Sequence, residues 1–177
     1  MNRPQEGLPN HLFEYLSSIT PLINVDLLIH NPKKGIILSW RSDNFYGPGW
    51  HVPGGIIRFK ENIVDRLYHV AKNEINLREN LEFRLISINQ IMNPNRDTRG
   101  HFISLLFTSK LKNSNIDNKN FKENDNGFFC WHRKLPDNII KQHKRYEKYM
   151  EQLIENKNPK IFDFGNIMEQ YSPNNEK

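Results

Sequence analysis

The stretch that most constrains the fold is residues 50–77, where a strand-like segment, a glycine pair and a predicted amphipathic helix follow one another. Because helix residues advance by about 100° each, the side chains of Ile63, Leu67, Val70 and Glu74 share one face of that helix. A carboxylate on an otherwise apolar stripe costs free energy unless a cation meets it. Glu74 therefore either binds a cation or reaches past the core and pairs with a basic side chain in the last turn.

The rest of the chain predicts a mixed order of helices and strands. We expect an N-terminal helix at about residues 10–18, capped by Asn10, and a long helix at about 137–155, capped by Asp137. The helix that carries Glu74 should begin near Glu61 or Asn62. Strands are predicted at residues 22–29, 36–40, 50–53, 82–91, 101–111 and 127–132. The expected fold class is α/β (α+β), a mixed β-sheet sandwiched between α-helices.

Length and cysteine content indicate one domain of a reducing compartment. A chain of 177 residues can bury a single core, and we expect one domain over residues 1–177 with a flexible tail at about 165–177. Cys130 is the single cysteine and excludes an internal disulfide. No segment approaches the ~20 apolar residues of a membrane span. A cytoplasmic location without membrane association is therefore expected.

The net charge of +5 does not indicate a nucleic-acid partner. Basic residues are spread along the chain, and their densest cluster, at residues 141–148, is interrupted by Glu147. No basic array interleaved with aromatic residues is present. A mildly basic surface instead suits an anionic small molecule.

The spacing of Gly55, Glu61, His69 and Glu74 resembles the sequence box of the Nudix hydrolases, which cleave nucleoside diphosphates linked to another group. The usual box carries three glutamates near its end, and here only Glu74 remains of them. This reduced box resembles that of the GDP-mannose mannosyl hydrolase branch, in which water attacks the sugar carbon. The segments at residues 19–26, 36–41 and 49–55 fit the same branch, and those at 101–105 and 128–131 fit it more weakly.

The resemblance implies a Mg²⁺ site and a set of catalytic positions. Glu74, a backbone carbonyl of Gly54 and Asp125 would bind the metal, since hard cations take oxygen ligands. Arg41 would stabilise the departing diphosphate, with an exposed strand-end arginine as the alternative. Asp26 would lie beside the substrate, or else pair internally with an arginine.

Two neighbouring positions stand where the branch supplies a metal ligand and its base. Asp125 replaces a glutamine and would act either as a metal ligand or as a weak base through water. Asn126 replaces the general-base histidine, and an amide cannot take up a proton near neutral pH.

Further substrate contacts follow from the same resemblance. Leu8 and Phe13 would lie beside the nucleotide base, with Phe13 contributing across a homodimer; the alternative places Phe13 in the core. Phe102 stands where the branch has a tyrosine that assists the leaving group, and His101 adjoins it in the substrate region.

Three functions remain open on these residues. The first is a Mg²⁺-dependent hydrolase of nucleoside diphosphate sugars, such as GDP-mannose or GDP-glucose, that releases GDP and the free sugar. The second is a pyrophosphohydrolase that cuts between the phosphates, for which a fuller set of box carboxylates is expected. The third is a sugar-nucleotide binding protein with weak catalysis, indicated by Asn126 and Phe102.

Overall fold

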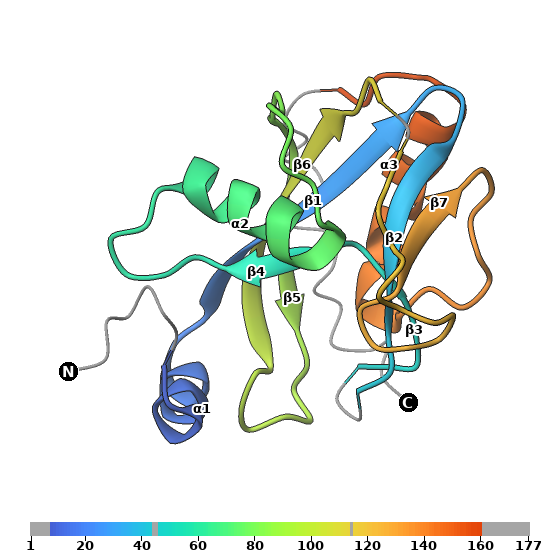
Figure 1. Cartoon of the computed structure of the whole chain (residues 1–177). Coiled ribbons are helices and arrows are strands. Elements are labelled where there is room, and N and C mark those ends of the chain that lie inside the picture. The colour runs from blue at the N-terminus through green and yellow to red at the C-terminus, as the bar shows by residue number, and fades with distance from the viewer. Residues whose placement is uncertain (1–7, 44–45, 114, 161–177) are drawn as a thin grey trace.

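The computed structural model of the protein describes residues 8–43, 46–113 and 115–160. Within these ranges a seven-stranded mixed sheet is flanked by helices (Figure 1). The described helices and strands are α1 (Asn10–Ile19), β1 (Leu22–Asn31), β2 (Gly35–Arg41), β3 (Gly49–His51), β4 (Gly54–Ile56), α2 (Ile63–Ile75), β5 (Arg84–Met92), β6 (His101–Lys110), β7 (Phe129–His132), a 3₁₀ helix at Lys141–Tyr146, and α3 (Glu147–Ile154). The tail predicted at 165–177 lies outside the described residues.

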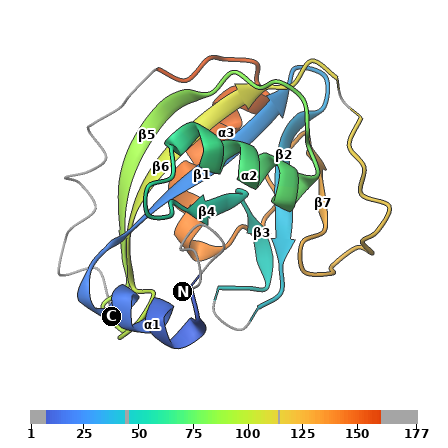
Figure 2. The same cartoon turned by 60° about the vertical axis from the view of Figure 1, so that its left-hand side comes forward.

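The central strand β1 separates two apolar layers, because successive side chains of a strand point to opposite faces. Val25, Leu27 and Ile29 are fully buried against α2 on one face. Leu28 is buried on the other face, among the side chains of α3. Figure 2 shows α2 and α3 on opposite sides of the sheet. The predicted mixed sheet between helices is confirmed.

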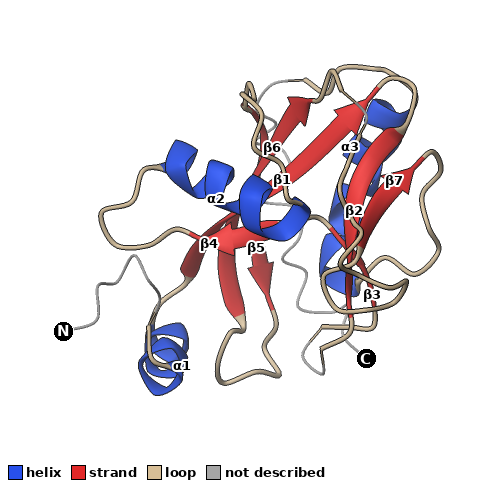
Figure 3. Ribbon diagram, in the orientation of Figure 1, coloured by secondary structure: helices blue, strands red, loops and turns tan. Residues whose placement is uncertain are grey.

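The pairing of β1 changes along its length and opens the sheet at one end. Its one edge pairs in parallel with β6 from Leu22 to His30, and β6 pairs antiparallel with β5. Its other edge pairs with β4 at residues 24–26 and with β2 only at His30 and Asn31. The strand β2 therefore diverges from β1, β4 takes its place beside residues 24–26, and the ends of β2 and β3 lie apart from β4 (Figure 3).

The glycine pair predicted as a turn or a close approach forms the short strand β4. A Cβ atom on Gly54 would lie 2.3 Å from Oδ1 of Asp26, so only glycine fits beside that carboxyl group. A Cβ on Gly55 would lie 3.2 Å from the side chain of Val70 on α2. The pair therefore brings the backbone of β4 close to both β1 and the helix that carries Glu74.

The prediction of a helix over 137–155 was wrong in its first third. The backbone at Asn138 and Ile140 instead bonds with Trp50 of β3, in a parallel bridge of 2.9 Å hydrogen bonds. Ile139 and Ile140 are buried, so the apolar pair serves as an added strand rather than as a helix turn. Asp137 consequently caps no helix, and regular α-helix begins only at Glu147.

The cap predicted for the first helix was also wrong. Pro9 occupies the N-cap position and Asn10 is the first helical residue. The Asn10 side chain donates to Glu14 and accepts a hydrogen bond from Arg99. In the described part of the chain no helix is long and apolar enough to cross a membrane.

Candidate active site

A pocket of about 270 Å³ opens between β4, which pairs with β1, and the end of β2, which diverges from β1. Its lining includes Asp26, Arg41, His51, Glu74, Phe102 and His143. Pockets for small ligands span about 300–1,000 Å³, so this cavity would enclose only part of a sugar nucleotide. A second hollow of about 510 Å³ shares Tyr46, Ile91, Phe102 and Gln142 with it and adds Lys141 and Arg145. The two together form one groove with cationic side chains along it.

Glu74 lies at the pocket without a hydrogen bond or ion pair to another described residue. Burial raises the pKa of its carboxyl group, and the positive charge of Arg41 lowers it in part. The ion pair with a neighbouring basic side chain of α2 is therefore absent among the described contacts. Leu67 and Val70 of the predicted stripe are buried, while Ile63 at its start is 41% exposed.

Asp26 lies at the floor of the pocket in a dense hydrogen-bond network. Its Oδ2 accepts hydrogen bonds from Ser104 and, at 2.6 Å, from the hydroxyl of Tyr146. Its Oδ1 accepts one from Asn24 at 3.0 Å. Burial raises the pKa of Asp26 to about 6, although these hydrogen bonds and the charges of Arg41 and Arg145 oppose the rise. The carboxyl group thus titrates near neutral pH, as a general base requires.

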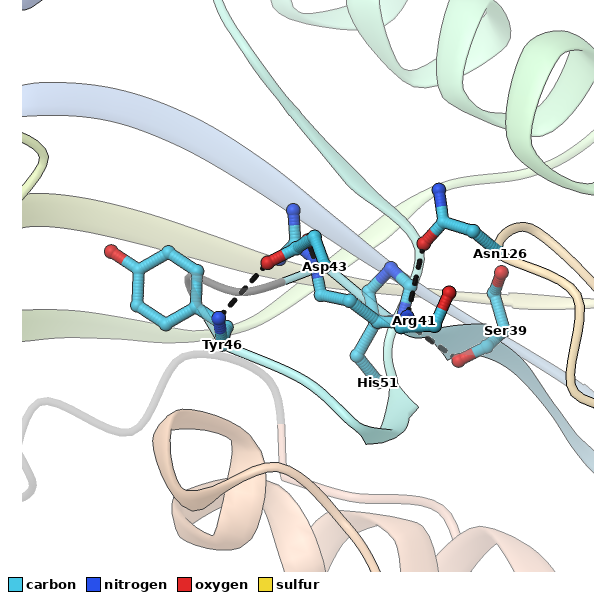
Figure 4. A network of polar contacts seen from close by, with 7 residues as sticks. Ser39, Arg41, Asp43, Tyr46, His51 and Asn126 are labelled. Carbon is cyan, nitrogen blue, oxygen red and sulfur yellow. Dashed lines mark hydrogen bonds and ion pairs between the residues drawn. The ribbon is translucent and has the colours of Figure 1, made fainter.

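Arg41 stands at the end of β2 and reaches the pocket beside Asp43. Its Nε pairs with Asp43 Oδ2, and its side chain is 35% exposed. Figure 4 shows Arg41, Asp43, Tyr46 and His51 gathered at this end of β2. The guanidinium carbon also lies 5.4 Å from the centre of the Tyr46 ring. An ion pair with Asp43 leaves the rest of the guanidinium fork for an anion in the pocket.

Aromatic rings and arginines line the rim of the pocket together. The Tyr46 ring lies 4.3 Å from the guanidinium of Arg96, and its hydroxyl donates to the carbonyl of Arg99 at 2.6 Å. Arg99 in turn lies 4.6 Å above the ring of Phe13. The backbone amide of Arg99 also donates a hydrogen bond of 3.0 Å to Ser17 Oγ of α1. The turn before β6 thereby holds α1, and with it Phe13, at the pocket.

Two buried histidines also line the pocket. Nδ1 of His51 lies 2.8 Å from the carbonyl oxygen of Ser39, and Nδ1 of His143 accepts the amide hydrogen of Val52 at 2.9 Å. Burial lowers the pKa of each ring to about 3. Both side chains are therefore neutral at physiological pH. No sequence pattern indicated His143, because only the bridge between Trp50 and Ile139 brings its segment to the pocket.

Comparison with known proteins shows which fold the chain has. No family model matches the chain. The low-salt glycan biosynthesis protein Agl8 of Haloferax volcanii is 28% identical over 120 residues, which cover 66% of this chain and 76% of that protein. A Nudix hydrolase from Nitrosomonas europaea superposes with a TM-score of 0.60 at 18% identity, over 81% of this chain and 77% of that one.

Two further solved structures superpose on the chain over most of its length. The MutT protein of Methanosarcina mazei gives a TM-score of 0.58 at 16% identity, over 79% of this chain and 99% of that chain. The Nudix domain of Shewanella oneidensis NrtR, in complex with ADP-ribose, gives 0.56 at 14% identity, over 84% of this chain and 96% of that chain. The chain has the Nudix fold.

Within this Nudix fold, α2 is the helix of the reduced box, and its two glutamate positions differ in role. Glu61 lies just before α2 and accepts hydrogen bonds from the Arg58 amide at 2.8 Å and from Arg66 at 2.9 Å. Its side chain is only 7% exposed. Glu61 therefore ties the loop after β4 to α2, whereas Glu74 is the box carboxylate at the pocket.

The oxygen donors at the pocket suit a hard divalent cation such as Mg²⁺. No group of three or more His, Cys, Asp or Glu side chains with metal-binding geometry occurs among the described residues. The donors are instead the Glu74 carboxylate, the backbone of β4 and Asn24, whose buried Oδ1 has no hydrogen-bond partner. Because Mg²⁺ keeps several waters and takes substrate phosphates as ligands, a donor set with one or two carboxylates fits it.

Several predicted site residues lie in the pocket and others do not. The predicted residues that line the pocket are Phe13, Asp26, Arg41, Gly54, Glu74 and Phe102. Leu12 and Leu16 are exposed, which speaks against the core alternative for Phe13.

Four predicted residues are absent from its lining: Leu8, His101, Asp125 and Asn126. Asp125 is exposed and accepts the amide hydrogen of Lys122 in a turn, and Asn126 accepts that of Ser42. His101 pairs with Gln90 at 2.9 Å.

Proposed function

We propose that the protein is a Mg²⁺-dependent hydrolase of nucleoside diphosphate sugars that releases the nucleoside diphosphate and the free sugar, with GDP-mannose or GDP-glucose as the substrate to test first. The observation that carries this proposal is the meeting of Glu74, Asp26 and Arg41 in one pocket of a Nudix fold. The pocket offers one box carboxylate, a second buried carboxylate and cationic side chains at its rim. These groups can neutralise the charge of a departing diphosphate, which is what attack at carbon requires; attack at phosphorus would require an activated water as well.

The surroundings of α2 favour attack at carbon over attack at phosphorus. Val70, which replaces one box glutamate, is 3% exposed in the apolar core, and Asn73, which replaces another, is exposed. Neither can add a carboxylate to the pocket. Cleavage between the phosphates requires metal ions that both bind and activate water, and such sites gather several carboxylates. The helix α2 supplies only one carboxylate to the pocket, that of Glu74.

The residues of the chain divide the proposed reaction among them. A water oxygen bonds to the anomeric carbon, the bond from that carbon to the diphosphate oxygen breaks, and the electron pair leaves with the diphosphate. Asp26, with a pKa of about 6, accepts the proton of the water. Arg41 stabilises the negative charge on the departing diphosphate. A Mg²⁺ ion held by Glu74 and the backbone of Gly54 would neutralise the same group.

The relatives support a sugar-nucleotide substrate. The name of the Agl8 relative refers to glycan biosynthesis, and the NrtR domain binds ADP-ribose, a nucleoside diphosphate joined to a sugar. The groove beside the pocket adds Lys141 and Arg145. Its cationic and aromatic lining can add contacts to a nucleotide whose base meets Phe13 and whose diphosphate meets Arg41 and Glu74 in the pocket, and the sugar would lie in the same pocket.

We also propose that the active form is a homodimer assembled through α1. Leu12, Tyr15, Leu16 and Ile19 are 44%, 63%, 37% and 61% exposed, so one side of this helix is apolar and uncovered. An exposed apolar patch of this kind favours protein association. Phe13 lies on the same helix at the pocket, so a dimer contact would bring the partner close to the nucleotide.

A sugar-nucleotide binding protein is the second candidate. Asn126 replaces the expected base, and its side chain is bonded to the Ser42 amide at the surface. Incubation of the purified protein with GDP-mannose, GDP-glucose and other sugar nucleotides in Mg²⁺ distinguishes the candidates. Release of GDP and free sugar supports the hydrolase, release of nucleoside monophosphate supports the pyrophosphohydrolase, and tight binding without products supports the binding protein.

A further inference from the structure

The hydrogen bonds of the two pocket histidines fix which ring nitrogen carries the proton. The carbonyl of Ser39 can only accept, so Nδ1 of His51 must donate to it, and Nε2 of the neutral ring is left as an acceptor. The amide of Val52 can only donate, so Nδ1 of His143 is unprotonated and Nε2 carries the hydrogen. The backbone thus sets one ring as an acceptor and the other as a donor.

The two rings stand side by side in the pocket wall. Their centres lie 6.0 Å apart with an angle of 46° between the planes, and each side chain is 9% exposed. Among the described residues, no hydrogen bond engages Nε2 of either ring. Since a ring nitrogen bonds an oxygen at about 2.8 Å, one or two small polar groups can span this separation.

A sugar hydroxyl matches this pair better than a phosphate does. A hydroxyl donates one hydrogen bond and accepts others, so it can serve both the acceptor of His51 and the donor of His143. An ionised phosphate only accepts and would leave Nε2 of His51 unpaired in a buried position. The anionic groups have their own partner in Arg41, which lines the same pocket.

We propose that His51 and His143 form a hydroxyl-recognition subsite that binds the sugar of a nucleoside diphosphate sugar, with Nε2 of His51 accepting from the sugar hydroxyls and Nε2 of His143 donating to them. This inference rests on the proposed function and deepens it, because it assigns the sugar to the wall formed by β3 and the 3₁₀ helix. The two histidines determine specificity and take no part in proton transfer during the reaction.

Asparagine variants separate this role from a structural one. In His51→Asn the side-chain amide can still donate to Ser39, and in His143→Asn the side-chain oxygen can still accept from Val52, but each variant lacks the nitrogen that faces the pocket. The affinity for GDP-mannose and for GDP is measured by calorimetry in Mg²⁺, in brief titrations at low temperature in which chromatography shows that GDP-mannose has not been hydrolysed. We expect each variant to weaken GDP-mannose binding by about 5- to 10-fold, with GDP binding unchanged.

His30→Asn is the matched control, since His30 is also buried on β1 but lies at the far end of the sheet from the pocket. It should leave both affinities unchanged. Deoxy analogues of GDP-mannose provide a second measurement on the native protein, in which removal of one sugar hydroxyl should reproduce the loss.

Equal losses for GDP and GDP-mannose in the variants, or no loss with any deoxy analogue, would overturn the subsite alone. Absence of binding to both ligands by the native protein would overturn the proposed function as well.

Discussion

The hydroxyl of Tyr146 donates a 2.6 Å hydrogen bond to Oδ2 of Asp26, which lies on the central strand. Ser104 bonds the same oxygen and lies 2.8 Å from the Tyr146 hydroxyl, so three elements meet at one carboxylate. Both donors stabilise the ionised form against the effect of burial. The 3₁₀ helix after the Trp50 bridge therefore tunes the carboxyl group at the pocket floor.

Replacing Tyr146 with phenylalanine should shift the pH dependence of the reaction. Loss of a donor to the carboxylate raises the pKa of Asp26 above about 6, so the base is ionised only at higher pH. The acid limb of the kcat/KM profile should move to higher pH by about one unit. Tyr68→Phe removes a hydroxyl that bonds Leu81 away from the pocket and should leave the limb in place. An unmoved limb in Tyr146→Phe would show that Asp26 is not the group that titrates.

Glu74→Gln should abolish activity without loss of stability. Burial already raises the pKa of Glu74, so a neutral amide of the same shape removes a destabilising charge. Calorimetry should also show weak Mg²⁺ binding by the native protein alone and tighter binding with GDP, because phosphates and water fill most positions around the metal. Full activity of Glu74→Gln, or tight Mg²⁺ binding without nucleotide, would contradict the assigned site.

Glu61→Gln should lower stability and retain activity, the reverse of what we expect for Glu74→Gln. It breaks the buried pair with Arg66 at 2.8 Å and should lower the free energy of unfolding by about 3 kcal/mol, as measured by urea denaturation. Activity at a temperature where the variant remains folded should be retained. Equal effects of the two substitutions on activity would argue that both glutamates bind the metal.

Phe13→Ala should weaken nucleotide binding by about 1–3 kcal/mol, the usual contribution of an aromatic ring stacked on a base. The ring lines the pocket beneath the guanidinium of Arg99. Titration with GDP measures the loss, and Tyr15→Ala on the exposed side of α1 separates stacking from dimerisation. Sedimentation of the native protein as a monomer would contradict the dimer, and unchanged affinity in Phe13→Ala would contradict the stacking.

The sequence predicted those features of the fold that depend on local pattern. The apolar run of β1 and the apolar stripe of α2 are properties of neighbouring residues, so both elements and the mixed sheet could be predicted. The segment at residues 137–140 has no such local signature, because its conformation depends on the backbone of Trp50. This long-range bridge also explains why the sequence did not predict His143 as a pocket residue or Tyr146 as a hydrogen-bond partner of Asp26.

Some residues of the site could likewise be predicted from the sequence, and others could not. Asp26, Arg41, Gly54 and Glu74 lie on strands and a helix whose positions depend on the sheet, and all four line the pocket. Asp125 and Asn126 lie in a loop, where residue spacing does not fix which way a side chain points. Asn24 was missed because only the network around Asp26 shows that its amide is oriented toward the pocket.

Arg41→Gln should slow turnover by about 10²–10³-fold, the usual loss when one donor to a developing anion is removed. The arginine side chain is 35% exposed, so its replacement should leave the fold unchanged. Arg133→Gln, at an exposed position after β7, is the matched control for the loss of one positive charge. Equal rates for the two variants would mean that Arg41 contributes only to the overall charge of the protein.

Hydrolysis of GDP-mannose in ¹⁸O-labelled water tests the central claim most directly, because it shows which bond breaks. Attack at the anomeric carbon puts the label on the released sugar and leaves GDP unlabelled, as read by mass spectrometry of both products. The surroundings of Asp26, Arg41 and Glu74 predict label on the sugar. Label in a phosphate product would contradict the account and identify a pyrophosphohydrolase.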